Sequence, residues 1–539
     1  MKRLFALTLL LTLLVACAPA ATATPLPAAA PTVLSATPAP TAIPRIWWRD
    51  AVFYEIFVRS FNDSNGDGIG DFNGITQKLD YLQSLGVTAL WLMPIHPSPS
   101  YHGYDVLNFY AVNPQYGTLD DFKRLTSEAH SRGIKIILDL VLNHTSSQHP
   151  WFVDANSGPQ AKYRNWYVWS ETEQGNGWYP GNGGNYFGLF WSGMPDLNYR
   201  NPEVTAQMEK VARYWLTEIG VDGFRVDAAK HLIEADGKTE NTPATHEWFK
   251  GFYQAYKADQ PEAFAVGEVY GAGGFLAKTY TDQLDEVFNF ELASGMLNSA
   301  NGGAKSGIES AYKFTLKDMP NGQYATFLTN HDQNRVMSVL NGKVEKAKVA
   351  ASLLLTAPGT PFIYYGEEIG MKGQKPDEDI RLPMQWTADP VTAGFTNGTP
   401  WRAPGAETVS ANVAVEEKDP NSLLNHYRKL IALRQAHPAL RTGTLTLIPI
   451  QHPGLAAYLR REGEENLLVL VNLTGEPVST YSLGTPSDSA LADGVYSLET
   501  LFGAGPAANL TVAQGQWQNY TPRALEPFET FVAQFIPIK

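Results

Sequence analysis

The chain has 539 residues, a formal net charge of −13 and a single cysteine. This acidic balance argues against binding to nucleic acid or to an anionic surface, and one cysteine excludes an intrachain disulfide. The length is too great for one hydrophobic core, so we expect more than one domain.

The N-terminal segment has the pattern of an export signal. Two basic residues precede an apolar run over residues 4–14, which suits a secretory signal better than a permanent membrane span. The Leu-Val-Ala that precedes Cys17 resembles a bacterial lipoprotein cleavage site, so Cys17 is the expected lipidation site; the alternative is an ordinary signal peptide with an incidental cysteine. We therefore predict a signal peptide (1–16), a semi-extended Ala, Pro and Thr-rich tether (17–45), and an extracellular protein anchored to the bacterial membrane by lipid.

From residue 51 onward, apolar strand-like runs alternate with stretches of helical spacing at 119–132, 202–218 and 344–356. This alternation predicts an α/β fold, a (β/α)8 TIM barrel, whose last helix stops before Pro438. The eight predicted strands lie near residues 52–58, 87–92, 134–142, 221–226, 263–266, 286–290, 325–328 and 361–364.

The C-terminal part has a different pattern. Short apolar runs such as 467–472 and 530–536 are separated by Gly and Pro. They predict a C-terminal antiparallel β-sandwich over residues 441–539.

Three of the predicted barrel strands end on an acid: Asp227, Glu268 and Asp332. The carboxyl ends of barrel strands form the face where catalytic residues gather. Arg225 precedes Asp227 by two residues and so points to the same side of the strand, where its charge would hold Asp227 ionised. Taken alone, such a pair is more often a buried structural ion pair.

Just after the first strand, oxygen-bearing side chains recur at Asp63, Asn65, Asp67 and Asp71, and the glycines between them permit a tight wrap. This pattern suits a hard cation and opens like an EF-hand loop, but Gly74 stands at position twelve in place of the bidentate Glu. The alternative is a polar turn without metal, in which three close carboxylates would repel one another.

With residues 139–144 (Asp-Leu-Val-Leu-Asn-His), the three acid-terminated segments resemble, in order, the four signature motifs of the α-amylase family of glycoside hydrolases. The resemblance implies retaining hydrolysis, in which two carboxyls stand about 5 to 5.5 Å apart. Asp227 would be the nucleophile, Glu268 the general acid and later the base, and Asp332 the acid that grips ring hydroxyls. Glu268 must then stay protonated while Asp227 is charged.

The resemblance also implies a substrate site for an α-glucan. His144 and His331 would hydrogen-bond the sugar at the cleavage point, Tyr104 would stack on it, and Lys230 and His231 would contact the sugar beyond the cut. A lone histidine is more often only a satisfied polar residue, but both histidines stand inside the motifs.

Domain boundaries and calcium sites follow from the same resemblance. A small domain B (144–200) would interrupt the barrel (46–143 and 201–440). The Ca2+ cofactor would bind in the first loop through Asp63, Asn65, Asp67, Asp71 and the carbonyl of Ile69, and between barrel and domain B through Asn143, Asp196 and the carbonyl of His231. The sequence does not identify the remaining ligand of the second site.

Individual motifs divide the possible activities. Lys230-His231, and Tyr101 where many exo-acting oligoglucosidases carry an Asp, favour an open cleft and endo-acting hydrolysis of α-1,4 bonds in starch and maltooligosaccharides. The stretches 194–198 and 381–386 resemble oligo-1,6-glucosidases and trehalose synthases as much as they resemble amylases, so an oligo-1,6-glucosidase, α-glucosidase or trehalose synthase is the alternative. A distant alternative is a non-catalytic carbohydrate-binding or transporter-accessory module, but such modules typically lose one of the acids. We expect a monomer whose membrane contact is the lipid alone.

Overall fold

The computed structural model describes residues 46–538 except 174, 320–321, 487–490 and 518. The predicted signal peptide, tether and lipidated Cys17 lie outside the described residues and stay predictions. Within the described part, none of the helices has the length and apolar character needed to span a bilayer.

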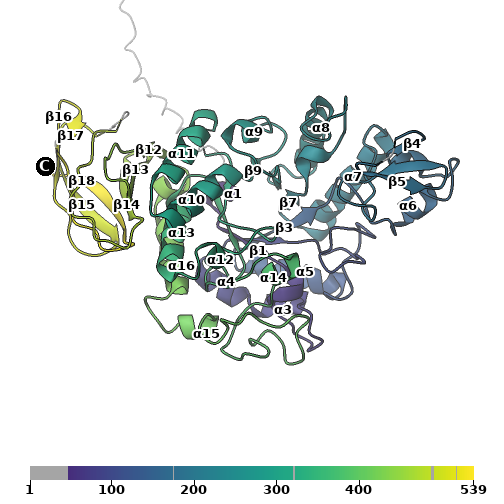
Figure 1. Ribbon diagram of the computed structural model, residues 1–539, viewed down its shortest axis with the longest axis horizontal. Coiled ribbons are helices and arrows are strands. Elements are labelled where there is room, and N and C mark those ends of the chain that lie inside the picture. Colours follow the sequence, from purple (N-terminus) through teal and green to yellow (C-terminus); the bar gives the residue numbers. More distant parts are fainter. Residues whose placement is uncertain (1–45, 174, 320–321, 487–490, 518, 539) are drawn as a thin grey trace, which may run out of the picture. The chain divides into compact units, whose positions relative to one another are not determined.

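The barrel predicted from the sequence is present (Figure 1). Its parallel strands pair in the order β10-β11-β1-β2-β3-β7-β8-β9, and a parallel bridge between Phe288 and Ala325 closes the ring between β9 and β10. All eight predicted strands are confirmed, although β9 and β10 are only two residues long. The strands are β1 (Phe53–Ile56), β2 (Ala89–Leu92), β3 (Lys135–Leu140), β7 (Gly223–Val226), β8 (Phe264–Gly267), β9 (Glu286–Val287), β10 (Ala325–Thr326) and β11 (Thr360–Tyr364).

The strands are apolar on both faces because both faces are buried. Alternate residues of most strands belong to two different core clusters, as expected when successive side chains point to opposite sides. The outward set packs on the helices. The inward set fills the barrel together with Trp48 of α1 (Trp47–Asp50) and includes Phe53, Trp91, Phe264, Phe288 and Phe362.

The predicted helices are also found. In α5 (Leu119–Ser131), Thr118 and Asp121 form a capping box, and α16 (Leu423–Ala436) stops just before Pro438. The stretch predicted from 202 to 218 is α7 (Pro202–Arg213) continued by a π-helical turn (Tyr214–Ile219). Other helices around the barrel are α3 (Phe72–Gln77), α4 (Leu79–Leu85), α8 (Pro243–Asp259), α9 (Gly274–Lys278), α10 (Phe290–Gly302), α11 (Ser306–Asp318) and α13 (Val344–Thr356).

The segment after β3 forms a small unit with its own sheet. Strands β4 (Trp169–Ser170), β6 (Gly184–Phe187) and β5 (Trp178–Gly181) pair in that order, beside α6 (Pro150–Ala155). A bridge between His144 and Asp196 joins the two ends of this segment at the barrel. The ends of domain B therefore meet at the carboxyl end of β3.

The C-terminal part is antiparallel, as predicted. Its strands join in one hydrogen-bonded sheet of order β12-β13-β14-β18-β15-β16-β17, with a separate apolar core. Tyr458 of β13 contacts the barrel helices: its hydroxyl lies 2.5 Å from Thr356 Oγ1, and its ring lies 5.7 Å from that of Tyr312. The strands are β12 (Thr444–Leu447), β13 (Leu455–Glu462), β14 (Glu465–Asn472), β15 (Gly494–Phe502), β16 (Leu510–Ala513), β17 (Gln516–Trp517) and β18 (Thr530–Pro537).

Candidate active site

A cavity of about 480 Å3 lies at the carboxyl ends of the barrel strands. Three loop segments of domain B and of the barrel supply aromatic side chains at its edge, and the strand ends supply the acids. Its lining comprises His102, Tyr104, His144, Phe190, Trp191, Met194, Asp227, Ala228, Lys230, His231, Glu268, Tyr270, Asp332, Asp377 and Arg381.

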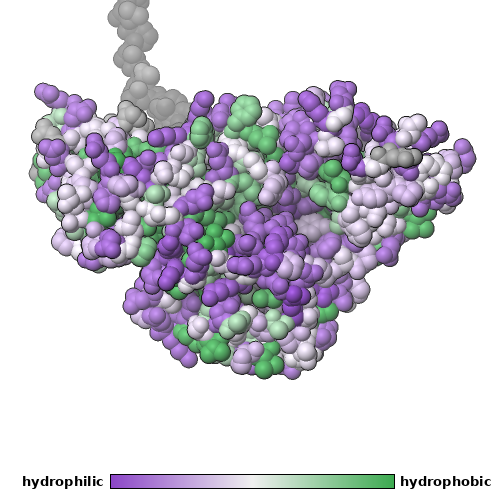
Figure 2. Space-filling model, viewed as in Figure 1, coloured by the Kyte–Doolittle hydropathy of each residue, from purple (hydrophilic) through white to green (hydrophobic). Residues whose placement is uncertain are grey.

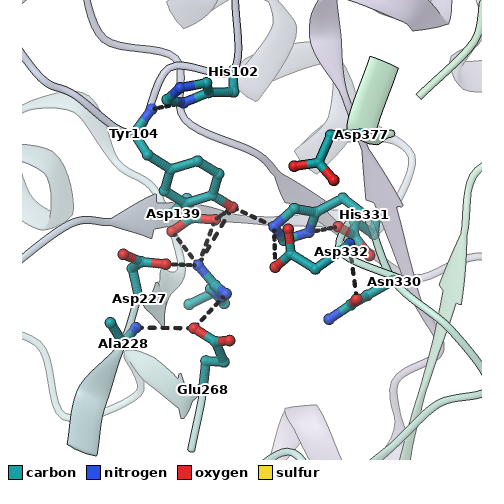
Figure 3. A network of polar contacts seen from close by, with 12 residues as sticks. His102, Tyr104, Asp139, Asp227, Ala228, Glu268, Asn330, His331, Asp332 and Asp377 are labelled. Carbon is teal, nitrogen blue, oxygen red and sulfur yellow. Dashed lines mark hydrogen bonds and ion pairs between the residues drawn. The ribbon is translucent and has the colours of Figure 1, made fainter. Parts of the chain in front are cut away.

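Arg225 ties together the acids of two neighbouring strands, Asp227 and Glu268, which Figure 3 labels. Its side chain is 1% exposed; Nη1 lies 2.6 Å from Asp227 Oδ1, and Nη2 lies 3.0 Å from Glu268 Oε2. Nη1 also donates to Asp139 Oδ1 at 2.9 Å, because Asp139 pairs with Arg225 in the register of β3 and β7. The predicted pair Arg225–Asp227 is thus part of a larger buried network that includes the second acid.

The Arg225 guanidinium does not by itself separate the pKa values of Asp227 and Glu268. Burial raises the pKa of both Asp227 and Glu268, and Arg225 opposes that rise in both. Two differences separate their pKa values: Asp227 has the shorter contact with Arg225, and the charge of Asp227 raises the pKa of Glu268. The charge of Asp332 raises the pKa of both carboxyls. The arrangement therefore favours a proton on Glu268.

The backbone after Asp227 fixes one oxygen of Glu268. Ala228 has a left-handed conformation (φ 46°), and its N–H donates to Glu268 Oε2 at 3.0 Å. Among the described residues, the polar contacts of this carboxyl are made through Oε2. Oε1 is thus the oxygen that can carry a transferable proton into the cavity.

Asp332 lies on the other side of the cavity in a cationic environment. His331 Nε2 is 3.1 Å from Asp332 Oδ2, and Arg381 Nη2 is 3.0 Å from Oδ1. Burial would raise the pKa of Asp332, but His331 and Arg381 outweigh it and hold that pKa well below its usual range. His331 Nδ1 in turn lies 2.6 Å from Glu55 Oε1, so Asp332 stays ionised and fixed.

Tyr104 and His144 line the cavity, and their contacts with a sugar stay predictions. The Tyr104 hydroxyl lies 2.7 Å from His331 Nε2 and donates to Asp139 Oδ2 at 3.0 Å, and its ring stacks on His331. His144 Nε2 is 3.2 Å from the Tyr104 carbonyl, and burial lowers the pKa of His144 to about 4. His144 is therefore neutral near pH 7.

Tyr101 does not belong to the cavity lining; its ring stacks on Trp401 at 5.7 Å, and its hydroxyl accepts from Arg381 Nη1 at 3.4 Å. Tyr101 is half-buried, and the prediction that its ring stacks on a further sugar stays a prediction.

Lys230 and His231 line the opposite edge of the cavity. Lys230 Nζ lies 2.7 Å from Glu240 Oε2 and donates to the Tyr270 carbonyl at 3.3 Å. His231 packs against Phe190 of domain B, with ring centroids 6.0 Å apart. This edge therefore joins a cation to several exposed aromatic rings.

Sequence reasoning missed several site residues. Asp377 lines the cavity and lies 3.2 Å from Arg381 Nη2, four residues along, and Asp139 anchors Arg225. Glu55 of β1 holds His331. Asp139 and Glu55 stand on strands among apolar neighbours, a signal that could have identified them, whereas the segment around Asp377 has no periodicity.

Two of the residues predicted to hold calcium between barrel and domain B, Asn143 and Asp196, carry oxygens that suit a cation. Asn143 Oδ1 and Asp196 Oδ2 are buried without hydrogen-bond partners, and the two side chains are neighbours. Glu234 Oε1 is also buried and unpartnered, and burial followed by the charge of Glu234 raises the pKa of Asp196 well above its usual value. Glu234 is therefore a candidate for the ligand that the sequence did not identify.

The loop after β1 offers the right donor types, but its carboxylates are satisfied by the loop itself. Asp63 accepts from the N–H groups of Asn65, Gly66 and Gly68, and Asp71 accepts from Ser64 and Gly74. In the described residues, no cluster of three or more His, Cys, Asp or Glu side chains is arranged to hold a metal. Calcium in this loop remains a prediction from donor chemistry.

The comparisons with known proteins agree on one family. A model of the alpha-amylase catalytic domain matches residues 55–443. The chain is 46% identical to alpha-amylase 3 of Dictyoglomus thermophilum over 436 residues, 79% of this chain and 85% of the relative. It is 35% identical to an oligo-1,6-glucosidase of Parageobacillus thermoglucosidasius over 515 residues, 80% and 91% of the two chains. The crystal structure of an alpha-amylase from H. orenii matches with a TM-score of 0.79 and 39% identity, covering 90% of this chain and 99% of that one.

Proposed function

Because the chain belongs to the α-amylase family of glycoside hydrolases, we propose that it hydrolyses internal α-1,4 bonds of starch and maltooligosaccharides with retention of anomeric configuration. The observation that carries this proposal is the position of the Arg225 guanidinium. Its two terminal nitrogens lie 2.6 Å from Asp227 Oδ1 and 3.0 Å from Glu268 Oε2. Two carboxyls that contact one guanidinium are neighbours, which agrees with the separation of about 5 to 5.5 Å that a retaining mechanism uses.

In the first step Asp227 attacks the anomeric carbon. Arg225 holds Oδ1, so among the contacts of the described chain Oδ2 is left to form the covalent bond. The bond between the anomeric carbon and the leaving oxygen breaks, and Glu268 Oε1 gives that oxygen its proton. Glu268 then takes a proton from water, whose oxygen attacks the anomeric carbon and releases Asp227.

The remaining polar residues position the sugar. Asp332, held ionised by His331 and Arg381, is suited to accept hydrogen bonds from ring hydroxyls and to stabilise positive charge on the sugar. The phenol of Tyr104 and the neutral imidazole of His144 line the same cavity. Calcium, when bound by Asn143, Asp196 and Glu234, would neutralise buried oxygens where domain B joins the barrel.

The direct test follows the anomer formed first. Proton NMR of maltopentaose hydrolysis should show the α-anomer before mutarotation, and Glu268→Gln should lower kcat by about 10^2 to 10^4-fold with KM nearly kept, since it removes a transition-state proton donor. Early β-anomer, or near-normal activity of Glu268→Gln, would contradict the mechanism.

Endo action has a separate test. Starch should lose viscosity and iodine staining well before reducing ends accumulate, because several sugars are held on both sides of the bond. The second candidate is an exo-acting oligo-1,6-glucosidase or α-glucosidase, or a trehalose synthase, and Asp377 favours it because a carboxylate in the lining can bind a terminal sugar. Glucose alone from the earliest times, or trehalose from maltose, would select that candidate.

The location of the enzyme is a further part of the proposal. The Leu-Val-Ala-Cys17 pattern supports lipid attachment at Cys17 and an extracellular, membrane-anchored monomer. A non-catalytic carbohydrate-binding or transporter-accessory module is disfavoured because all three acids line one cavity.

A further inference from the structure

Glu55 and His331 form an ion pair that is buried in the barrel. Hydrophilic residues cover most of the face of the molecule in Figure 2, whereas the side chains of Glu55 and His331 are 2% and 1% exposed. Glu55 shares the inward face of β1 with Phe53, two residues earlier. Taking two charges out of water is costly, so a buried ion pair is weak evidence for a purely stabilising role.

The partners of the His331 ring determine how many protons the ring carries. Nδ1 faces the Glu55 carboxylate, which accepts hydrogen bonds and donates none. Nε2 lies 3.1 Å from Asp332 Oδ2 and 2.7 Å from the Tyr104 hydroxyl (Figure 3). That hydroxyl donates its own hydrogen to Asp139 Oδ2, so towards His331 it is an acceptor. Both ring nitrogens therefore face acceptors, and the doubly protonated imidazolium satisfies all of them.

His331 connects Glu55 to both sides of the catalytic site. On one side its Nε2 contacts Asp332, which lines the cavity. On the other side it contacts the Tyr104 hydroxyl, which also accepts from Nη1 of Arg225 at 3.4 Å, the same nitrogen that holds the nucleophile. Glu55 itself lies outside the cavity lining, so any effect on the reaction passes through His331.

We propose that Glu55 is a positioning residue for catalysis: through His331 it fixes the Asp332 carboxylate and the Tyr104 hydroxyl beside the reacting sugar. This inference rests on the proposed function. With Gln at position 55, the amide can turn and donate to Nδ1, and a neutral ring with one proton on Nε2 then satisfies its partners.

The neutral ring would hold its partners less tightly. A charge-assisted hydrogen bond is roughly twice as strong as a neutral one, so loss of the His331 charge weakens the contact with Asp332. A small displacement of a group that faces the reacting atoms lowers the rate strongly, because the bound geometry must be close to that of attack. We therefore expect the change at Glu55 to lower kcat more than it raises KM.

The kinetic test compares Glu55→Gln and Glu55→Asp with Glu465→Gln as the matched control. Glu465 lies 2.7 Å from His437 Nδ1, a pair of the same kind outside the cavity lining. On maltopentaose, well below the Tm of each variant, Glu55→Gln should lower kcat about ten- to a hundredfold and change KM less than about threefold. Glu55→Asp keeps the charge and should retain more of kcat than Glu55→Gln, and Glu465→Gln should match the unaltered enzyme.

A spectrum of the unaltered enzyme tests the charge of His331 directly. Burial lowers and the charges of Asp332 and Glu55 raise the pKa of His331, which is about 9 in the folded protein. Long-range proton–nitrogen NMR spectra of histidine-labelled enzyme at pH 8 should therefore show both ring nitrogens protonated. The signal is assigned by its change in Glu55→Gln or, if that variant does not fold, by contact with the Trp91 ring, 5.5 Å away. A neutral His331 ring at this pH would overturn the inference.

The outcomes separate this inference from the proposed function. If the unaltered enzyme cleaves maltopentaose and Glu55→Gln has the same kcat, even with a lower Tm, the inference is refuted and the proposed function stands. If Glu465→Gln lowers kcat as much as Glu55→Gln does, the loss is not specific to the site and the inference is refuted as well. If the unaltered enzyme cleaves no α-glucan, the proposed function fails first and this inference fails with it.

Discussion

Replacing Glu55 by Gln should destabilise the protein near neutral pH and weaken the pH dependence of its stability. Glu55 Oε1 lies 2.6 Å from His331 Nδ1, and the side chains are 2% and 1% exposed. Burial would lower the pKa of His331, but Asp332 and Glu55 outweigh it and raise that pKa to about 9. Glu55→Gln removes one of these two charges with little change in volume.

The size of the effect follows from the pKa. A rise from about 6.5 in the unfolded chain to about 9 corresponds to about 3 kcal/mol. Because the folded pKa is the higher one, this stabilisation is complete below about pH 6.5 and is lost as the pH rises through about 9. A hydrogen bond to a charged group contributes about 1.5 to 3 kcal/mol, so the variant should lose about 2 kcal/mol at pH 6 and much less at pH 10.

Differential scanning calorimetry at pH 6 and pH 10, at one ionic strength, measures this difference. Unfolding entropy of about 2.1 cal/mol/K per residue gives roughly 1 °C per kcal/mol for a cooperative unit of this length, so Tm should fall by about 2 °C at pH 6. Glu465→Gln is the matched control, since Glu465 lies 2.7 Å from His437 in a more hydrated pair with side chains 18% and 17% exposed. An equal fall in Tm for Glu55→Gln at both pH values would refute the reasoning.

Three further predictions concern metal and lipid. Chelation with EGTA should lower Tm, because an ion bound only by the folded state stabilises that state. Asp67→Ala should remove part of this calcium dependence. If neither chelation nor Asp67→Ala changes Tm, the loop after β1 is no metal site. Glu234→Gln should weaken calcium binding, measured by titration calorimetry, whereas Glu240→Gln, a control on the same loop, should not. Cys17→Ala should abolish lipid attachment, and mass spectrometry showing unmodified Cys17 in protein processed by a bacterial host would contradict the anchor.

The strands and their terminal acids were predictable because both depend on local sequence. Short, nearly continuous apolar runs buried on both faces identify strands; Asp227 and Glu268 follow such runs directly, and Asp332 follows one after Thr329, Asn330 and His331. Asp377 was missed because an irregular segment carries it to the cavity. The contact of Asp139 with Arg225 depends on the register between β3 and β7, which no local pattern specifies. The stacking of Tyr101 on Trp401 was not predictable, because Trp401 is 300 residues away in the chain.

The number of paired positions between neighbouring strands differs around the barrel. β3 and β7 share four paired positions, whereas β9 and β10 meet through the single bridge from Phe288 to Ala325. Asp227 stands at the end of the well-paired β7, while Asp332 follows the two-residue β10 beside the weak seam. Local opening of the ring should therefore begin at the seam and not between β3 and β7, while the contacts of Asp332 with His331 and Arg381 hold that side chain in place.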